Sequence, residues 1–226
     1  MYRFTRSTVH GCTDRNKYTT SPHLIKIMLD KSVPYAKIKM VRKAGTPIPD
    51  FPLPEGFKFT FFTDGCEEDW ARIETSVDEF DSVFEALLFF KEEFIPYKEE
   101  LYRRCLFIEN EDGKKIATST AWWSFVKDER RAWLHWVSVD ADYQGLGLGK
   151  AIVSKVTKLL EEIEGDVNFY LSTQTWSYKA VDIYKKCGYD LTDEKVLYGK
   201  KHKHDYKKAV KILGKLKRIK KIVASG

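Results

Sequence analysis

The sequence has few of the residues that build metal centres or disulfide frameworks. It contains no Cys-x-x-Cys pair, and no histidine stands at metal-ligand spacing from a cysteine. His202 and His204 lie in a lysine-rich stretch, where the neighbouring positive charge opposes cation binding. We therefore assign no metal site and expect reduced, packed thiols. The four cysteines are Cys12, Cys66, Cys105 and Cys187.

Long apolar runs are also absent. No stretch approaches the roughly 18 apolar residues that a transmembrane helix requires. The N-terminus has neither an apolar leader core nor an Ala-x-Ala cleavage site. We expect a cytoplasmic protein with no membrane span. With 226 residues, of which 43% are apolar, the chain is long enough to bury one sizeable core.

Positive charge is concentrated at the C-terminal end. The formal net charge is +6, but eleven Lys or Arg residues fall between positions 200 and 221, against the single acid Asp205. The rest of the chain carries a small acidic excess, so nucleic acid is not an expected partner of the folded body.

The basic tail has the pattern of an amphipathic helix. From Asp205 onward, apolar residues recur at three- to four-residue spacing on an otherwise basic surface: Val210, Leu213, Leu216 and Ile219. We interpret this as a helix that docks on its own domain. A contact with a partner or within a homodimer is the next alternative. RNA or an anionic membrane has less support, because the tail shows no aromatic RNA-binding pattern and no lipidation motif.

Composition divides the chain into three segments. Residues 1–52 hold an irregular arm to about residue 32, a strand over 34–42 and the start of a proline-rich connector. Residues 53–199 form the main domain, and residues 200–226 form the basic helix. We expect the folded core to begin after the connector.

Within the main domain, the order of strands and helices bounded by glycine and proline predicts an α/β (α+β) protein. Its sheet is expected to be mixed, mostly antiparallel and flanked by helices. Trp133, His135, Val137 and Val139 alternate, so we expect them on one face of their strand. The expected strands cover 57–62, 104–109, 115–124, 131–140 and 167–172, and the expected helices cover 67–77, 82–94, 149–163 and 178–186.

The most informative feature is a glycine-rich turn between a strand and a helix. Gln144-Gly145-Leu146-Gly147-Leu148-Gly149-Lys150 follows the strand at 131–140 and opens the helix at 149. Glycines let a backbone approach a phosphate closely, and the unpaired N–H groups of a first helical turn attract an anion. A Walker A loop is disfavoured because Gln144 and Ala151 replace its first Gly and its Ser or Thr. The Gly-x-Gly-x-Gly spacing also departs from the dinucleotide fingerprint.

The spacing Gln-x-x-Gly-x-Gly resembles the coenzyme A signature of the GCN5-related N-acetyltransferase (GNAT) superfamily. A second motif of that family is a helix that contains Asn, Ala and Tyr and is followed by Gly and an aromatic residue. This sequence matches that motif, except that Ser stands in the place of Asn. The resemblance covers about residues 53–197. The matching residues of the second motif are Ser177, Ala180, Tyr184, Gly188 and Tyr189.

This resemblance implies an acetyltransferase that uses acetyl-CoA and acts on a primary amine of a small molecule or peptide, by direct attack in a ternary complex. In the family the strand before the turn splays from its neighbour, and its main chain binds the pantetheine arm. A non-catalytic acyl-CoA-binding module on the same fold is the alternative. The implied cofactor-binding residues are Val137, Val139, Gln144, Gly145, Leu146, Gly147, Leu148, Gly149, Lys150 and Ser177.

The chemistry sets two further requirements. An alkylamine with a pKa of about 10.4 must lose a proton before it attacks, and the expelled thiolate must gain one. Tyr184 matches the tyrosine that many family members use as the acid. His135 stands where several relatives place a general base, with Glu74 or Asp78 as the next candidates. Four tryptophans are candidates for an aromatic wall of the acceptor pocket: Trp122, Trp123, Trp133 and Trp176.

Overall fold

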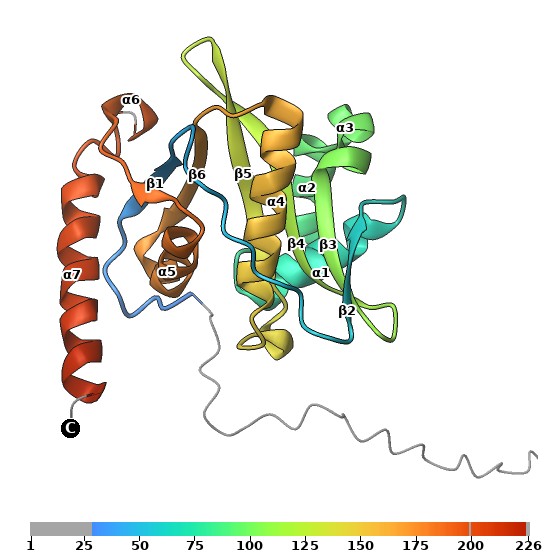
Figure 1. Ribbon diagram of the computed structural model, residues 1–226, viewed down its shortest axis with the longest axis horizontal. Coiled ribbons are helices and arrows are strands. Elements are labelled where there is room, and N and C mark those ends of the chain that lie inside the picture. The colour runs from blue at the N-terminus through green and yellow to red at the C-terminus, as the bar shows by residue number, and fades with distance from the viewer. Residues whose placement is uncertain (1–28, 199, 225–226) are drawn as a thin grey trace, which may run out of the picture.

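The computed structural model describes residues 29–198 and 200–224, with side chains described up to residue 218. In this part of the chain one sheet contains seven strands in the order β2-β3-β4-β5-β6-β1-β7 (Figure 1). Only β5 and β6 pair in parallel, so the predicted mixed, mostly antiparallel sheet is confirmed. The strands are β1 (Lys37–Arg42), β2 (Phe57–Phe61), β3 (Cys105–Asn110), β4 (Lys115–Val126), β5 (Glu129–Val139), β6 (Phe169–Gln174) and β7 (Asp190–Leu191).

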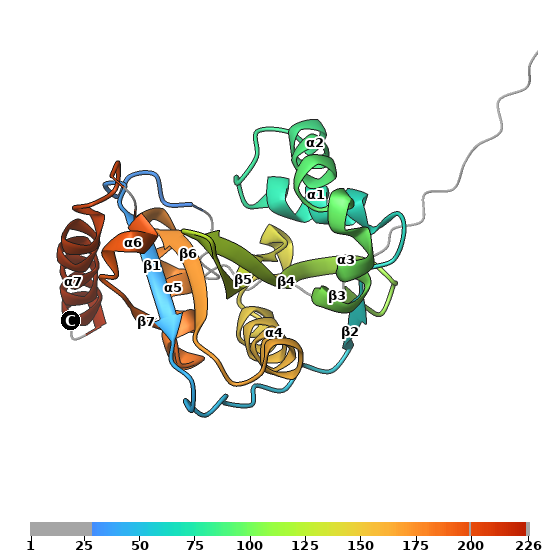
Figure 2. The ribbon, with the colours of Figure 1, turned by 90° about the horizontal axis from the view of Figure 1, so that it is seen from above.

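Helices cover both faces of this sheet. As Figure 2 shows, α4 lies against one face of the central strands, and α1 and α2 lie against the other. The α5 helix packs beside α4, whereas α6 and α7 pack against β1. The helices are α1 (Cys66–Ser76), α2 (Val83–Glu93), α3 (Lys98–Arg104), α4 (Leu148–Glu164), α5 (Tyr178–Lys186), α6 (Lys195–Tyr198) and α7 (Asp205–Ala224).

Local sequence signals explain most of these boundaries. The Ser82 hydroxyl accepts a hydrogen bond from the Glu85 amide and so caps α2. Gly165, at φ 78°, ends α4, and Gly113, at φ 79°, makes the turn of the β3–β4 hairpin. In α4, residues such as Ile152 and Val156 repeat at helical spacing and are fully buried against the sheet. Helix α3 and the short helix α6 were not predicted.

The position of β1 corrects one prediction. We expected the folded core to begin after the proline-rich connector, but β1 precedes the connector and lies between β6 and β7. It pairs with β6 from Lys37↔Gln174 to Arg42↔Phe169. Ile38 and Met40 have no exposed surface. The pairing joins segments more than 120 residues apart, and such a long-range contact leaves no local sequence signal.

The basic helix α7 docks on its own domain, as predicted. Ala209 is fully buried, and Ile212 and Leu213 pack partly against the main core. At the start of the helix, the Asp205 carboxylate accepts a hydrogen bond of 3.0 Å from the Lys37 amide on β1. The arm up to residue 28 and Cys12 lie outside the described residues, and Cys66, Cys105 and Cys187 are buried free thiols.

The role of β1 in the core can be tested with Met40→Ala. Removing this buried side chain from a strand that is paired on both sides should lower the free energy of unfolding by about 2–5 kcal/mol. The exposed Lys43→Ala, just beyond the strand, should change it by less than about 0.5 kcal/mol. Urea unfolding followed by circular dichroism measures both. Equal, small effects would contradict the assignment of β1 to the core.

Candidate active site

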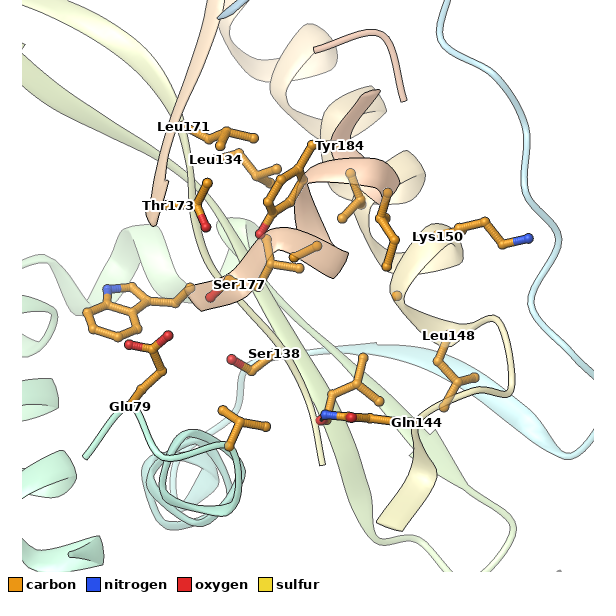
Figure 3. Close-up of a pocket in the computed structure, with 18 of the residues that line it drawn as sticks. Glu79, Leu134, Ser138, Gln144, Leu148, Lys150, Leu171, Thr173, Ser177 and Tyr184 are labelled. Carbon is orange, nitrogen blue, oxygen red and sulfur yellow. Dashed lines mark hydrogen bonds between the residues drawn. The ribbon is translucent and has the colours of Figure 1, made fainter. Parts of the chain in front are cut away.

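The site begins where the pairing of β5 and β6 ends. The two strands pair at Trp133↔Tyr170 and Leu134↔Leu171 and then separate. We call this end of the pairing the vertex. Beyond it, β5 stays paired with β4 as far as Val139, and β6 stays paired with β1 as far as Gln174. A cavity of about 560 Å³ occupies the gap between the separated strands (Figure 3).

A bulge in β5 decides which side chains face which side of this gap. Trp136 has φ 50°, and the register with β4 shifts between Thr118 and Thr120. His135 therefore shares a face with Ser138, whereas Val137 shares the α4 face with Leu134.

The prediction that Trp133, His135, Val137 and Val139 lie on one face is therefore wrong. Val137 and Val139 pack with the core under α4, whereas Trp133 and His135 lie on the opposite face of the sheet. The extra residue of the bulge interrupts the two-residue alternation on which the prediction depended.

All the predicted site residues except Leu146 line this one cavity. Leu146 instead packs against the main core. Of the four candidate wall tryptophans only Trp133 lines the cavity, and Trp136, which was not predicted, joins it.

The glycine turn closes one end of the cavity. Gly145 and Gly147 have φ 85° and φ 88°, conformations that favour glycine, and Gly147 is the residue from which α4 begins. The Gln144 side-chain amide donates a hydrogen bond of 3.0 Å to the Val139 carbonyl, which ties the turn to the end of β5. The residues of the first turn of α4 thus line the gap.

Close packing beside the turn brings α5 to the cavity. A Cβ at Gly149 would stand 3.2 Å from Ile183 Cδ1, so glycine lets α5 approach α4. The Lys150 side chain points away from the cavity centre, and its Nζ lies 5.3 Å from the Phe51 ring centroid (Figure 3). The charge of Lys150 is therefore directed away from the cavity, and its amide donates a hydrogen bond of 3.1 Å to the Gly147 carbonyl.

Tyr184 on α5 lines the middle of the gap. Its hydroxyl points into the cavity, near Thr173 and Ser177 (Figure 3). Burial, together with the carboxylates of Glu79 and Glu74, raises the pKa of Tyr184 above its usual range. The phenol is therefore protonated at neutral pH and able to donate a proton.

Two acidic side chains from the α1 side, Glu74 and Glu79, line the same cavity as Tyr184. Glu74 is fully buried; its Oε2 accepts a hydrogen bond of 2.8 Å from Ser138, and its Oε1 has no partner among the described residues. Burial raises the pKa of Glu74 to about 8. Glu79 is exposed at the rim, where Gln174 donates a hydrogen bond of 3.3 Å to it.

His135 lies on the same face as these acids, near the vertex. Burial and the neighbouring Lys39 lower the pKa of His135 to about 4, so its imidazole is neutral at physiological pH. Glu79 and Ser138 were not predicted, because the turn after α1 and the bulge in β5 bring them to the gap. Asp78, the other candidate base, does not line the cavity.

The comparisons with known proteins agree with this geometry. The model of the acetyltransferase (GNAT) family matches residues 68–189, more than half of the chain. The chain belongs to the GNAT family. The resemblance found in the two motifs is thereby confirmed. No curated protein matches the sequence.

Solved structures show the same fold at low sequence identity. A GCN5-related N-acetyltransferase from Sphaerobacter thermophilus has a TM-score of 0.56 at 20% identity, over 71% of this chain and 49% of that one. A GCN5-related glucosamine N-acetyltransferase region of a fungal multi-domain GH3 β-N-acetylglucosaminidase has a TM-score of 0.51 at 14% identity. This match covers 70% of this chain and 20% of that one. An acetyltransferase of the GNAT family from Colwellia psychrerythraea has a TM-score of 0.50 at 13% identity, and the match covers 70% of this chain and 54% of that one. This GNAT chain thus spans about half the length of the Sphaerobacter protein.

Two other kinds of feature are absent from the described residues of this GNAT protein. No group of three or more His, Cys, Asp or Glu side chains is arranged there to hold a metal ion. None of the described helices combines the length and the apolar character that a membrane crossing demands.

The raised pKa of Glu74 predicts how stability depends on pH. The folded state favours the protonated carboxyl, so the contribution of Glu74 to wild-type stability falls as pH rises from about 4.5 to about 8. Glu74→Gln removes this titration. The free energy of unfolding of the variant relative to wild type should therefore increase through that window, by at most ~1.4 kcal/mol for each pH unit, and level off above it.

Urea unfolding from about pH 5 to about pH 9 measures this difference. Glu68→Gln, at an exposed position of the same helix, is the control and should show no such trend. A Glu74→Gln difference that stays constant with pH would mean that the carboxyl is ionised in the folded protein throughout.

Proposed function

We propose that this protein is an acetyl-CoA-dependent N-acetyltransferase that acetylates a primary amine of a small molecule or peptide by direct attack in a ternary complex. One observation carries the proposal. A single cavity joins the glycine turn and the start of α4 to a phenol, a carboxyl and an imidazole, along a strand edge that has no partner strand.

The residues of the gap fit coenzyme A. The amides from Gly145 to Gly149 would hold its diphosphate, because they lie at the positive end of α4. The unpaired edge of β5 from His135 to Val139 extends over roughly 16 Å at ~3.3 Å per residue, which suits an extended pantetheine arm. Main-chain groups on that edge, including those of Val137, would bind the amides of the arm. When bound, acetyl-CoA supplies an activated acetyl thioester at the vertex.

Tyr184 is the proposed acid. Its buried hydroxyl keeps its proton at neutral pH and faces the gap, so it can pass that proton to a thiolate that leaves between β5 and α5. Ser177 lies beside it and supports the arm through its hydroxyl.

Proton removal from the amine involves Glu74 and His135 in different ways. With a pKa near 4, the neutral His135 imidazole accepts a hydrogen bond from the amine but retains a proton poorly. Glu74, with a pKa of about 8, is much closer to the pKa of an alkylamine, and its Oε1 is unoccupied by the described residues. We therefore propose that Glu74 accepts the proton of the amine and that His135 positions the amine.

The proposed function is tested with CoA and a panel of primary amines. CoA should stabilise the protein by about 2.7 kcal/mol at one hundred times its dissociation constant, and an amine of the panel should accelerate thiol release from acetyl-CoA. Tyr184→Phe should keep the CoA stabilisation and lower kcat by roughly 10²–10⁴-fold. Stabilisation by CoA without turnover on any amine would instead favour the non-catalytic acyl-CoA-binding module.

The division between Glu74 and His135 predicts different pH profiles. In the wild type kcat/KM should rise with pH up to about 8, because the ionised form of Glu74 increases over that range. Glu74→Gln should lose this rise and lower kcat/KM at pH 8 by roughly 10²-fold or more. His135→Ala should lower kcat/KM while keeping the rise, since Glu74 is intact. The reverse pattern would make His135 the base.

A further inference from the structure

A lysine from β1 lies at the vertex. Lys39 pairs with Ser172, the first residue of β6 beyond the point where β6 leaves β5. Its side chain crosses toward β5, and its Nζ lies 4.8 Å from the ring centroid of Trp133. Ser172 and Trp133 both line the cavity, whereas Lys39 itself does not. Its amine therefore lies behind the Trp133 ring, next to the end of the gap at which the thioester is expected.

The surroundings of Lys39 are unusual for a lysine. The residue is only 8% exposed, and no carboxylate of the described residues forms an ion pair with it. Burial, with Lys37 nearby, lowers the pKa of Lys39 to about 8. A much larger fraction of this amine is therefore neutral near physiological pH than for an exposed lysine, and only a neutral amine attacks a thioester.

We propose that Lys39 is a self-acetylation site, modified by the active site of its own chain when no acceptor amine is bound. This inference rests on the proposed function. The neutral Nζ attacks the acetyl carbon of acetyl-CoA; a C–N bond forms, the C–S bond breaks, and the thiolate takes a proton from Tyr184. The proton that the new amide nitrogen releases goes to Glu74. The products are N-acetyl-Lys39 and CoA.

The burial of Lys39 distinguishes its self-acetylation from non-enzymatic acetylation of lysines by free acetyl-CoA. Lysines on the outer face of α7, such as Lys207, Lys211 and Lys215, are exposed and open to any acetyl donor in solution. Lys39 is covered by its own domain, so a donor in solution has little access to it. Self-acetylation within one chain also proceeds with a rate constant that does not depend on protein concentration.

The test is to incubate the purified protein with acetyl-CoA alone and locate acetyl groups by peptide mass spectrometry. We expect one acetyl group on Lys39, accumulating with the same rate constant at two protein concentrations. Lys39→Arg should abolish it. Lys37→Arg, on the same strand and face, is the matched control and should retain it, and Tyr184→Phe should slow it by at least tenfold.

A second measurement needs no CoA. Because the charge of Lys39 lowers the pKa of His135, Lys39→Met should raise the pKa of His135 in an NMR titration, whereas Lys37→Met should leave it nearly unchanged. An unchanged His135 pKa in Lys39→Met would show that the amine does not lie at the vertex and would overturn the inference.

CoA stabilisation in the same samples separates the two ways in which the mass measurement can fail. Stabilisation with Lys39 unmodified, or with acetyl groups on exposed lysines alone, overturns self-acetylation and leaves the proposed function standing. Absence of stabilisation overturns the proposed function, and the inference with it.

Discussion

The structure depends on one interruption of the sheet, the separation of β5 from β6 after Leu134↔Leu171. Neither strand frays there, because β4 holds β5 as far as Val139 and β1 holds β6 as far as Gln174. The gap is thus a fixed opening with a paired strand on each side. Its edge carries main-chain groups that a continuous sheet would have paired, and buried main-chain groups of this kind require another partner. A ligand with amide groups can supply that partner.

Both covering layers direct side chains into the same opening. On one face, Gly149 lets α5 approach α4 closely, and this brings the Tyr184 phenol to the gap. On the other face, Trp70 contacts Phe90, Phe94 and Trp136, which fixes α1 against the bulged part of β5. Since α1 is anchored in this way, Glu74 meets Ser138 within hydrogen-bonding distance. The bulge is therefore part of the site, because it turns Ser138 to the α1 face, where His135 already lies.

The sequence was sufficient for the features that local chemistry determines. The glycine turn, the helix with Tyr184 and the β3–β4 hairpin each depend on residues within about ten positions of one another, and all three were predicted. Features that depend on distant contacts were not: β1 joins the sheet through β6, and the bulge at Trp136 reflects its pairing with β4. For the same reason Glu74 was only a secondary candidate, and Lys39, which reaches Trp133 from another strand, was not predicted as a site residue.

Burial favours the neutral form of four titratable groups around the gap. It raises the pKa of Glu74 and Tyr184 and lowers the pKa of His135 and Lys39, so each group is driven toward its neutral form. A cavity with such walls favours reactants that are neutral as well. In the proposed function, an amine that enters as an ammonium ion would be under the same pressure to lose its proton, and the pKa of Glu74 is high enough for it to take that proton. The cost of burying these groups would then be connected to the proposed chemistry, because the same loss of water that destabilises their charged forms would prepare a neutral amine for attack.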